Sequence, residues 1–209
     1  VIEAALDAVF AEPEGGPVQA VAAVVIVRDG RILAERYAPG FDPQVPVLGW
    51  SVSKSVVQAL IGTLVQDGRL DPLAPAPVAA WRQPGDPRGA VSIDQLLRQT
   101  SGQPFGSTNN GFDAASQMLF LAPDTATTSA QARFDPPGTW SYTDGNYAIL
   151  SGTLRDTIGG GAAGVAGYAR ERLFGPLGMR SAVIEFDQSE TPMGAAFILA
   201  TPRDWARFG

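Results

Sequence analysis

One β-hairpin followed by mostly helical sequence limits the folds that are open to this chain. The hairpin is predicted over residues 20–38, where the β-branched run 21–28 meets the turn signal Asp29-Gly30 and residues 31–37 return. A two-stranded ribbon is only marginally stable alone, and the chain supplies few further strands. The pattern predicts an α+β fold, and we expect sequence after Gly209 to complete the sheet.

Apolar residues at helical spacing predict helices in the rest of the chain. The clearest covers residues 51–67, and Gly68 is placed to end it. Ser92 and Gln95 form a capping-box pattern that begins a short helix ending at Gly102. Further helices are predicted over 1–12, 113–121, 145–158, 165–174 and 202–209, and a strand over 181–186.

Composition excludes several classes of protein. The 209 residues include no histidine and no cysteine, which rules out Ser-His-Asp triads, cysteine nucleophiles, zinc fingers and histidine-ligated metals. A formal net charge of −6 argues against a nucleic-acid partner. Apolar runs are shorter than the roughly 18 residues that span a bilayer. We predict no cofactor, no bound metal and no membrane span.

Lys54 is the only lysine, since 14 of the 15 basic residues are arginines. It follows Ser51 by three residues at the start of the clearest helix, so both side chains lie on one face. Unpaired N–H groups at a helix start favour an oxyanion and oppose a second positive charge. A serine nucleophile needs a base, and lysine, unlike arginine, can release its proton. We predict that Ser51 is the nucleophile and Lys54 its base. Ser53 and Ser55 are rival candidates for the nucleophile, and we interpret both as structural residues.

A loop rich in proline and glycine, residues 136–147, carries Tyr142. A tyrosine there is placed to relay a hydrogen bond to a serine or a leaving group, and a half-buried packing role is the alternative. Its phenol needs a neighbouring cation to act as a base. Two acid pairs would suit a glycosidase, but we interpret them as solvated surface. They are Asp67 with Asp71 and Glu185 with Asp187.

Five short segments carry a family resemblance. They are residues 50–55 followed by 67–71, residues 96–102, residues 137–144, residues 174–179 and residues 200–208. Together they resemble the serine β-lactamase-like hydrolases, which include class C β-lactamases, DD-peptidases and related esterases. Within residues 96–102, Gln99 stands in place of the usual histidine. The sequence around Trp50 and Trp205 is most similar to that of the 6-aminohexanoate-dimer (nylon oligomer) hydrolases.

The resemblance implies a role for each matching residue. Ser51 would be the acylated nucleophile, Lys54 its general base and Tyr142 the relay that brings a proton to the leaving group. The backbone N–H of Ser51 would form half of the oxyanion hole. The implied fold is an antiparallel sheet flanked by helices plus a mostly helical region, with the active site between them.

Two departures from the family pattern affect the expected substrate. Asp144 replaces an asparagine that helps to hold the substrate amide, which makes an efficient β-lactamase less expected and would suit a substrate with an amine. Asn146 is the candidate substitute, and Trp50 is a further candidate for substrate binding. The third family motif, a lysine or histidine before threonine or serine and glycine, is absent, so we expect its strand to follow Gly209.

These observations predict a metal-free serine hydrolase that cleaves a small ester or amide through an acyl-enzyme. The alternatives are a non-catalytic penicillin-binding-type scaffold, a β-lactamase or DD-peptidase proper, and an acyltransferase. We expect one incomplete domain over 1–209, with a helical region over 68–180. The partner that we expect for this domain is the segment of the same protein that follows Gly209. The sequence predicts neither an oligomeric state nor a cellular compartment. Residues 103–139 either line the pocket or pack the helical region, through Phe105, Phe112, Met118, Phe120 and Phe134.

Overall fold

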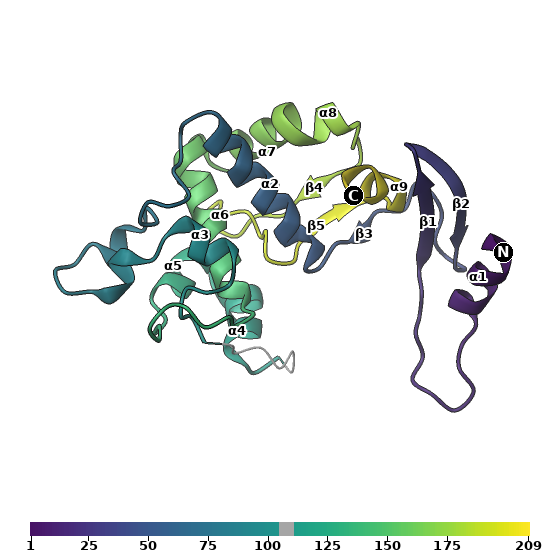
Figure 1. Ribbon diagram of the computed structural model, residues 1–209, viewed down its shortest axis with the longest axis horizontal. Coiled ribbons are helices and arrows are strands. Elements are labelled where there is room, and N and C mark those ends of the chain that lie inside the picture. The colour runs from purple at the N-terminus through teal and green to yellow at the C-terminus, as the bar shows by residue number, and fades with distance from the viewer. Residues whose placement is uncertain (105–110) are drawn as a thin grey trace. The chain divides into compact units, whose positions relative to one another are not determined.

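The computed structural model describes residues 1–104 and 111–209 and divides them into two compact units (Figure 1). The hairpin unit contains residues 1–47, 177–183 and 199–209. The helical unit contains residues 48–176 and 184–198, and so includes Ser51 and most of the predicted helical region. A single domain over the whole chain stays a prediction.

The hairpin unit confirms the first predicted elements. Helix α1 (Ile2–Phe10) precedes strands β1 (Ala23–Arg28) and β2 (Arg31–Tyr37), which pair antiparallel. Asp29 and Gly30 have φ angles of +50° and +71°, the left-handed conformation that a two-residue Asp-Gly turn adopts. Helix α9 (Pro202–Phe208) also belongs to this unit.

Arginine side chains attach the helices of the hairpin unit to β2. Arg36 forms ion pairs with Glu3 at 2.9 Å and with Asp7 at 2.7 Å, both on α1. Arg203 on α9 pairs with Glu35 of the same strand. The hydrogen bond from Arg203 lowers the pKa of Glu35 below its ordinary value. Consecutive residues of β2 therefore bind different helices, because side chains alternate along a strand.

Two long helices form the centre of the helical unit. Helix α2 (Val52–Gln66) buries Val56, Leu60 and Leu64 along one face, as its spacing predicted. Helix α6 (Asp144–Ile158) is buried at ten consecutive residues, since α2, α3, α5 and α7 all contact it. The surrounding helices are α3 (Ile93–Leu97), α4 (Ala114–Leu121), α5 (Thr125–Ala130), α7 (Gly161–Ala169), η3 (Arg170–Phe174), α8 (Gly175–Leu177), η1 (Ala79–Trp81) and η2 (Pro87–Ala90).

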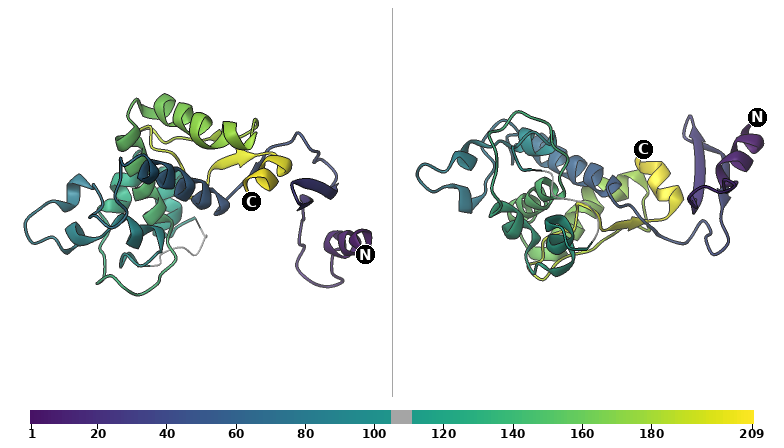
Figure 2. Two further views of the ribbon diagram at one scale, coloured as in Figure 1. Left: turned by 45° about the horizontal axis from the view of Figure 1, so that its top comes forward. Right: turned by 90° about the horizontal axis from the view of Figure 1, so that it is seen from below.

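Figure 2 shows the continuous helical run from α7 to α8 beside α2, where η3 makes the contact. A second sheet of three short strands has the order β3 (Val47–Leu48), β5 (Ile198–Ala200) and β4 (Val183–Ile184). None of the helices in the described part of the chain is both long and apolar enough to cross a membrane.

Some boundaries differ from the sequence predictions. The predicted strand over 181–186 is reduced to β4, and the capped helix ends at Leu97 rather than Gly102. Helix α5 was not predicted, because its sequence, TATTSA, is poor in strong helix formers. It forms against α6, where Gly152 permits close packing: a Cβ there would lie 2.6 Å from the Cβ of Ala126.

Asp187 joins α5 to the turn that follows β4, so our interpretation of this residue as solvated surface is wrong. One oxygen accepts hydrogen bonds from the backbone N–H and hydroxyl of Thr125, and the other from Ser189 and from the N–H of Thr191. Burial alone would raise the pKa of Asp187, but these hydrogen bonds outweigh it and lower the pKa.

We expect the Asp187→Asn substitution to cost about 1–3 kcal/mol of stability at neutral pH, because hydrogen bonds to a charged acceptor weaken. The folded pKa is lowered, so the carboxylate stabilises the fold above its unfolded pKa of about 4 and loses this effect as pH falls through the folded value. Urea denaturation of both proteins at neutral and acidic pH should show their difference shrinking with acidity. A difference that does not vary with pH would contradict this account.

Candidate active site

The nucleophile candidate Ser51 stands at the first turn of α2. It is the N-cap residue, yet its hydroxyl caps no backbone N–H and is left for other partners. Trp50 before it has a φ of +43°, an uncommon left-handed conformation for a bulky residue, which sequence reasoning did not foresee. Within the described residues, the backbone N–H of Ser51 has no hydrogen-bond partner.

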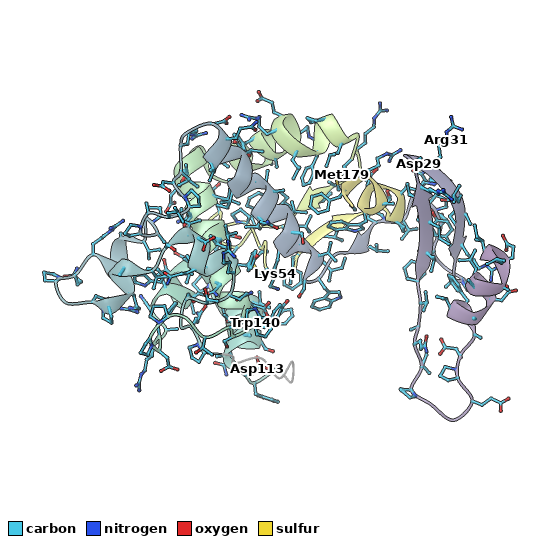
Figure 3. The ribbon with its side chains drawn as sticks, viewed as in Figure 1. Asp29, Arg31, Lys54, Asp113, Trp140 and Met179 are labelled. Atoms are coloured by element: carbon cyan, nitrogen blue, oxygen red, sulfur yellow. The ribbon has the colours of Figure 1, made fainter. Side chains whose placement is uncertain are left out.

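Lys54 projects from the first turn of α2 and is nearly buried, with 7% of its side chain exposed (Figure 3). Its Nζ lies 3.1 Å from Ser51 Oγ, 2.6 Å from Asp144 Oδ1 and 2.7 Å from the carbonyl oxygen of Ala195. An ammonium group has three N–H donors, one for each of these oxygens. A neutral amine would donate to the carboxylate and the carbonyl, which can only accept, and would turn its lone pair toward Ser51. The same geometry therefore suits Lys54 both before and after it accepts the proton of Ser51.

Tyr142 completes the contacts of the serine hydroxyl. Its OH lies 2.5 Å from Ser51 Oγ, and Lys54 Nζ lies 5.0 Å from the centre of its ring. The neighbouring cation that sequence analysis required is thus present. Tyr147 is also near Lys54, at 5.9 Å, but its OH donates to the carbonyl of Leu97 and burial raises its pKa.

Gln99 fixes the segment that carries Tyr142. Its Oε1 accepts from the backbone N–H of Thr143 at 3.2 Å and from Asn146 Nδ2 at 2.8 Å, while its Nε2 donates to the carbonyl of Thr143 at 3.1 Å. Its own carbonyl accepts from the N–H of Ser141 at 2.9 Å. An amide can accept and donate at once, so Gln99 binds both sides of the tyrosine.

Asn146 is buried and hydrogen-bonded within the protein. Its side chain is fully buried, with Nδ2 bonded to Gln99 and Oδ1 accepting from Ser101 at 2.8 Å. The suggestion that Asn146 replaces the missing substrate amide is therefore not retained. It lies in the first turn of α6, where the helix faces the core, a position that proximity in sequence to Asp144 concealed.

A glycine allows the third partner of Lys54 to approach. A Cβ on Gly194 would lie 2.3 Å from Val57 Cγ2 and 2.6 Å from Ser151 Oγ, distances that no side chain tolerates. The chain therefore passes close to α2 at this point, and the next residue, Ala195, offers its carbonyl to Lys54. Sequence reasoning missed both residues, because neither carries a reactive side chain.

The two rival candidates for the nucleophile, Ser53 and Ser55, lie in other surroundings. Ser53 is buried, and its Oγ accepts from the backbone N–H of Ile198 at 3.2 Å. Ser55 is exposed on the next turn of α2. Among the described residues, no group of three or more acidic side chains is arranged to hold a metal ion.

Exposed tryptophans flank the serine and tyrosine. Trp50 is 58% exposed, and Trp140 is 65% exposed with its ring 6.4 Å from that of Tyr142. Of the apolar side chains expected over 103–139, Met118 is buried, and the half-buried Phe134 meets Trp81 edge-on at 5.3 Å. Phe112 and Phe120 are exposed, and Phe105 lies outside the described residues.

Comparison with known proteins identifies the family. The sequence profile of the Beta-lactamase family matches residues 6–209. The chain belongs to this family. It is 42% identical over 75 residues to the 6-aminohexanoate-dimer hydrolase of Paenarthrobacter ureafaciens, a match that covers 36% of this chain and 19% of that protein. The predicted resemblance and fold class are confirmed.

Solved structures of the beta-lactamase fold agree with this assignment. A Bacillus anthracis protein assigned as a 6-aminohexanoate-dimer hydrolase matches with a TM-score of 0.74 and 22% identity, over 90% of this chain and 52% of that one. A D-stereospecific amidohydrolase from Streptomyces sp. matches with a TM-score of 0.63 and 16% identity, over 84% and 63%. At these identities the matches establish the fold alone. The chain spans less than two thirds of the length of each of these relatives. The family to which it belongs is one of serine hydrolases.

Proposed function

We propose that this chain carries the acylation machinery of a serine hydrolase that cleaves an ester or amide bond. The observation that supports this most is the position of Ser51 Oγ, 2.5 Å from the hydroxyl of Tyr142 and 3.1 Å from Nζ of Lys54. A serine hydroxyl becomes a nucleophile when a neighbouring base accepts its proton. The only lysine of the sequence meets that need.

In the proposed reaction, Lys54 in its amine form accepts the proton of Ser51 while Oγ bonds to the substrate carbonyl carbon. The carbonyl electrons move onto oxygen, and the unpaired N–H of Ser51 stabilises the resulting oxyanion. When the bond to the leaving group breaks, Tyr142 gives that group a proton and regains one from Lys54. Water then attacks the acyl-enzyme by the same steps in reverse and releases Ser51.

Asp144 is proposed to position Lys54 rather than to bind substrate. Its Oδ1 forms the 2.6 Å ion pair with Nζ, and only 13% of its side chain is exposed. Together with the carbonyl of Ala195, it fixes two of the three Nζ directions and leaves the third for Ser51. Trp50 is retained as a proposed substrate contact, since it adjoins the nucleophile and is exposed.

The amide bond is the favoured member of the proposed substrate class. One protein of similar fold is named a D-stereospecific amidohydrolase, a name that describes amide hydrolysis. A poorer leaving group needs more help from a proton donor, and the contact of Tyr142 with Ser51 places such a donor beside the reacting atom.

We expect a fluorophosphonate probe to modify the whole protein once, on Ser51. Intact mass spectrometry and peptide mapping would locate the adduct. The Ser51→Ala variant should take no adduct, whereas Ser55→Ala, which removes an exposed serine from the same helix, should be labelled like the wild type. An adduct on another residue, or none on the folded protein, would refute the proposed nucleophile.

A further inference from the structure

A turn after α3, residues 99–102, runs beside the segment that leads to Tyr142. Three backbone hydrogen bonds join the two: Ser141 donates to Gln99 at 2.9 Å, Gly138 to Thr100 at 2.9 Å and Asp135 to Gly102 at 2.7 Å. Gln99 thus pairs with the residue directly before the tyrosine. The mechanism proposed above uses none of the side chains of this turn.

The side chain of Gln99 binds the residue directly after the tyrosine. Its Oε1 accepts from the backbone N–H of Thr143 at 3.2 Å, and its Nε2 donates to the carbonyl of the same residue at 3.1 Å. Both neighbours of Tyr142 are therefore bound to one residue, Ser141 through its main chain and Thr143 through its side-chain amide. These bonds restrict the backbone on either side of Tyr142, and so fix the direction from which its OH meets Ser51 Oγ at 2.5 Å.

Gln99 combines two features that are uncommon for glutamine. Its φ is +61°, in the left-handed region that side chains with a Cβ rarely adopt, and only 6% of the residue is exposed. A buried amide is costly unless its donors and its acceptor find partners, and Asn146 Nδ2 supplies one more at 2.8 Å from Oε1. Backbone conformations of this kind persist where the surrounding contacts hold them, and they gather at functional sites.

The two proton transfers of the proposed reaction depend differently on the position of Tyr142. Lys54 takes the proton of Ser51 during attack, whereas Tyr142 supplies a proton when the leaving group departs. Nitrophenolate is a good leaving group that departs without a proton, but an alkoxide or an amine needs one. A displaced Tyr142 should therefore slow the reaction mainly for substrates with poor leaving groups.

We propose that Gln99 is a positioning residue for Tyr142, and that it thereby determines how well the protein expels poor leaving groups. The inference rests on the proposed function, because it assumes that Tyr142 protonates the leaving group. Gln99 acts through Ser141 and Thr143, the two residues that it binds, rather than on the reacting atoms.

The first test compares the ethyl and nitrophenyl esters of acetic acid as substrates of the whole protein. Because kcat/KM covers the steps up to acylation, the ratio of its values for the two esters reports how well the leaving group is expelled. Leucine is similar in size to glutamine but neither accepts nor donates. We expect Gln99→Leu to lower the ethyl-to-nitrophenyl ratio at least about tenfold, within the range of general acid catalysis.

The matched control is Gln66→Leu, which makes the same exchange at an exposed position at the end of α2. It should keep the wild-type ratio. Circular dichroism would show that each variant is folded. An unchanged ratio in folded Gln99→Leu would overturn the proposal.

A double variant shows whether Gln99 acts through the tyrosine. Tyr142→Phe removes the proton donor itself and should lower the ratio at least as far as Gln99→Leu does. If Gln99 only positions Tyr142, the variant with both changes should have the ratio of Tyr142→Phe alone, because the two effects are then not additive. Additive losses would show that Gln99 affects the reaction by another route, and would also overturn the proposal.

The Gln99→His variant is a second test that keeps a polar side chain in the buried turn. Histidine is enriched among residues with positive φ, and a neutral imidazole carries one donor and one acceptor for Thr143. An imidazolium ring carries donors only, so it cannot accept from the Thr143 N–H. We expect a near-wild-type ratio at alkaline pH that is lost as pH falls below about 6.5, the ordinary pKa of histidine.

This pH profile is measured relative to the wild type, because both proteins share the other ionisable groups around residue 99. These are Asp144 and Tyr147 on α6, Lys54 on α2, Tyr142, and Arg98 with its partner Asp94. A variant-to-wild-type ratio that does not vary with pH would contradict the proposal. Failure of the proposed function would look different, since the wild type would then form no acyl adduct on Ser51 even with nitrophenyl acetate.

Discussion

Replacing Lys54 with arginine is expected to lower the rate of Ser51 acylation by about a thousandfold, within the range of general-base catalysis. Arginine keeps the positive charge and can still donate to Asp144 and Ala195, but it cannot accept the serine proton. Stopped-flow or burst measurements with an acetyl ester would give the acylation rate directly. The test separates a base from a cation that only stabilises charge.

Two further variants control for the change in side-chain shape at position 54. Lys54→Met removes both charge and base with a side chain of similar length, and it should be as slow as Lys54→Arg. Arg133→Lys makes the reverse exchange at an exposed position and should have wild-type activity. Circular dichroism and thermal melting would show whether each variant is folded. Near-normal acylation in folded Lys54→Arg would rule out the base role.

Removing the carboxylate of Asp144 is expected to cost about 3–5 kcal/mol of stability, because it leaves a buried charge without its partner. The two side chains are 7% and 13% exposed, so water compensates little for the loss. Asp144→Asn should cost less than Asp144→Ala, since an amide oxygen can still accept from Nζ. Both should also slow acylation, because Lys54 loses part of what orients it toward Ser51.

Urea denaturation of the whole protein would measure these costs. The matched control is Asp94→Ala, which breaks an ion pair with Arg98 whose side chains are 32% and 72% exposed. That pair should contribute less than about 1 kcal/mol. If Asp144→Ala costs no more than Asp94→Ala, then the ion pair with Lys54 does not hold the site together as proposed.

The local features of the site could be predicted from the amino-acid sequence. A helix start is a short-range property, so the spacing of Ser51 and Lys54 placed both on one face of α2. The Asp29-Gly30 turn and the capping box at Ser92 were confirmed for the same reason. The absence of histidine left lysine as the conventional base, and the order of five short segments indicated the family that the comparisons confirm.

Contacts between distant segments set how these residues are held and what surrounds them. Asp144 and Ala195, which bind Lys54, lie 90 and 141 residues from it, and no local pattern encodes such contacts. Gln99 and Asn146 form a buried hydrogen-bond network, because buried polar groups must find partners wherever the fold brings them. The carboxylate of Asp187 joins α5 to the turn after β4 on the same principle, whereas that of Glu185, two residues earlier, stays exposed. The sequence sets which polar side chains the chain carries. The packing of distant segments decides which of them form hydrogen bonds within the protein and which remain accessible to a substrate.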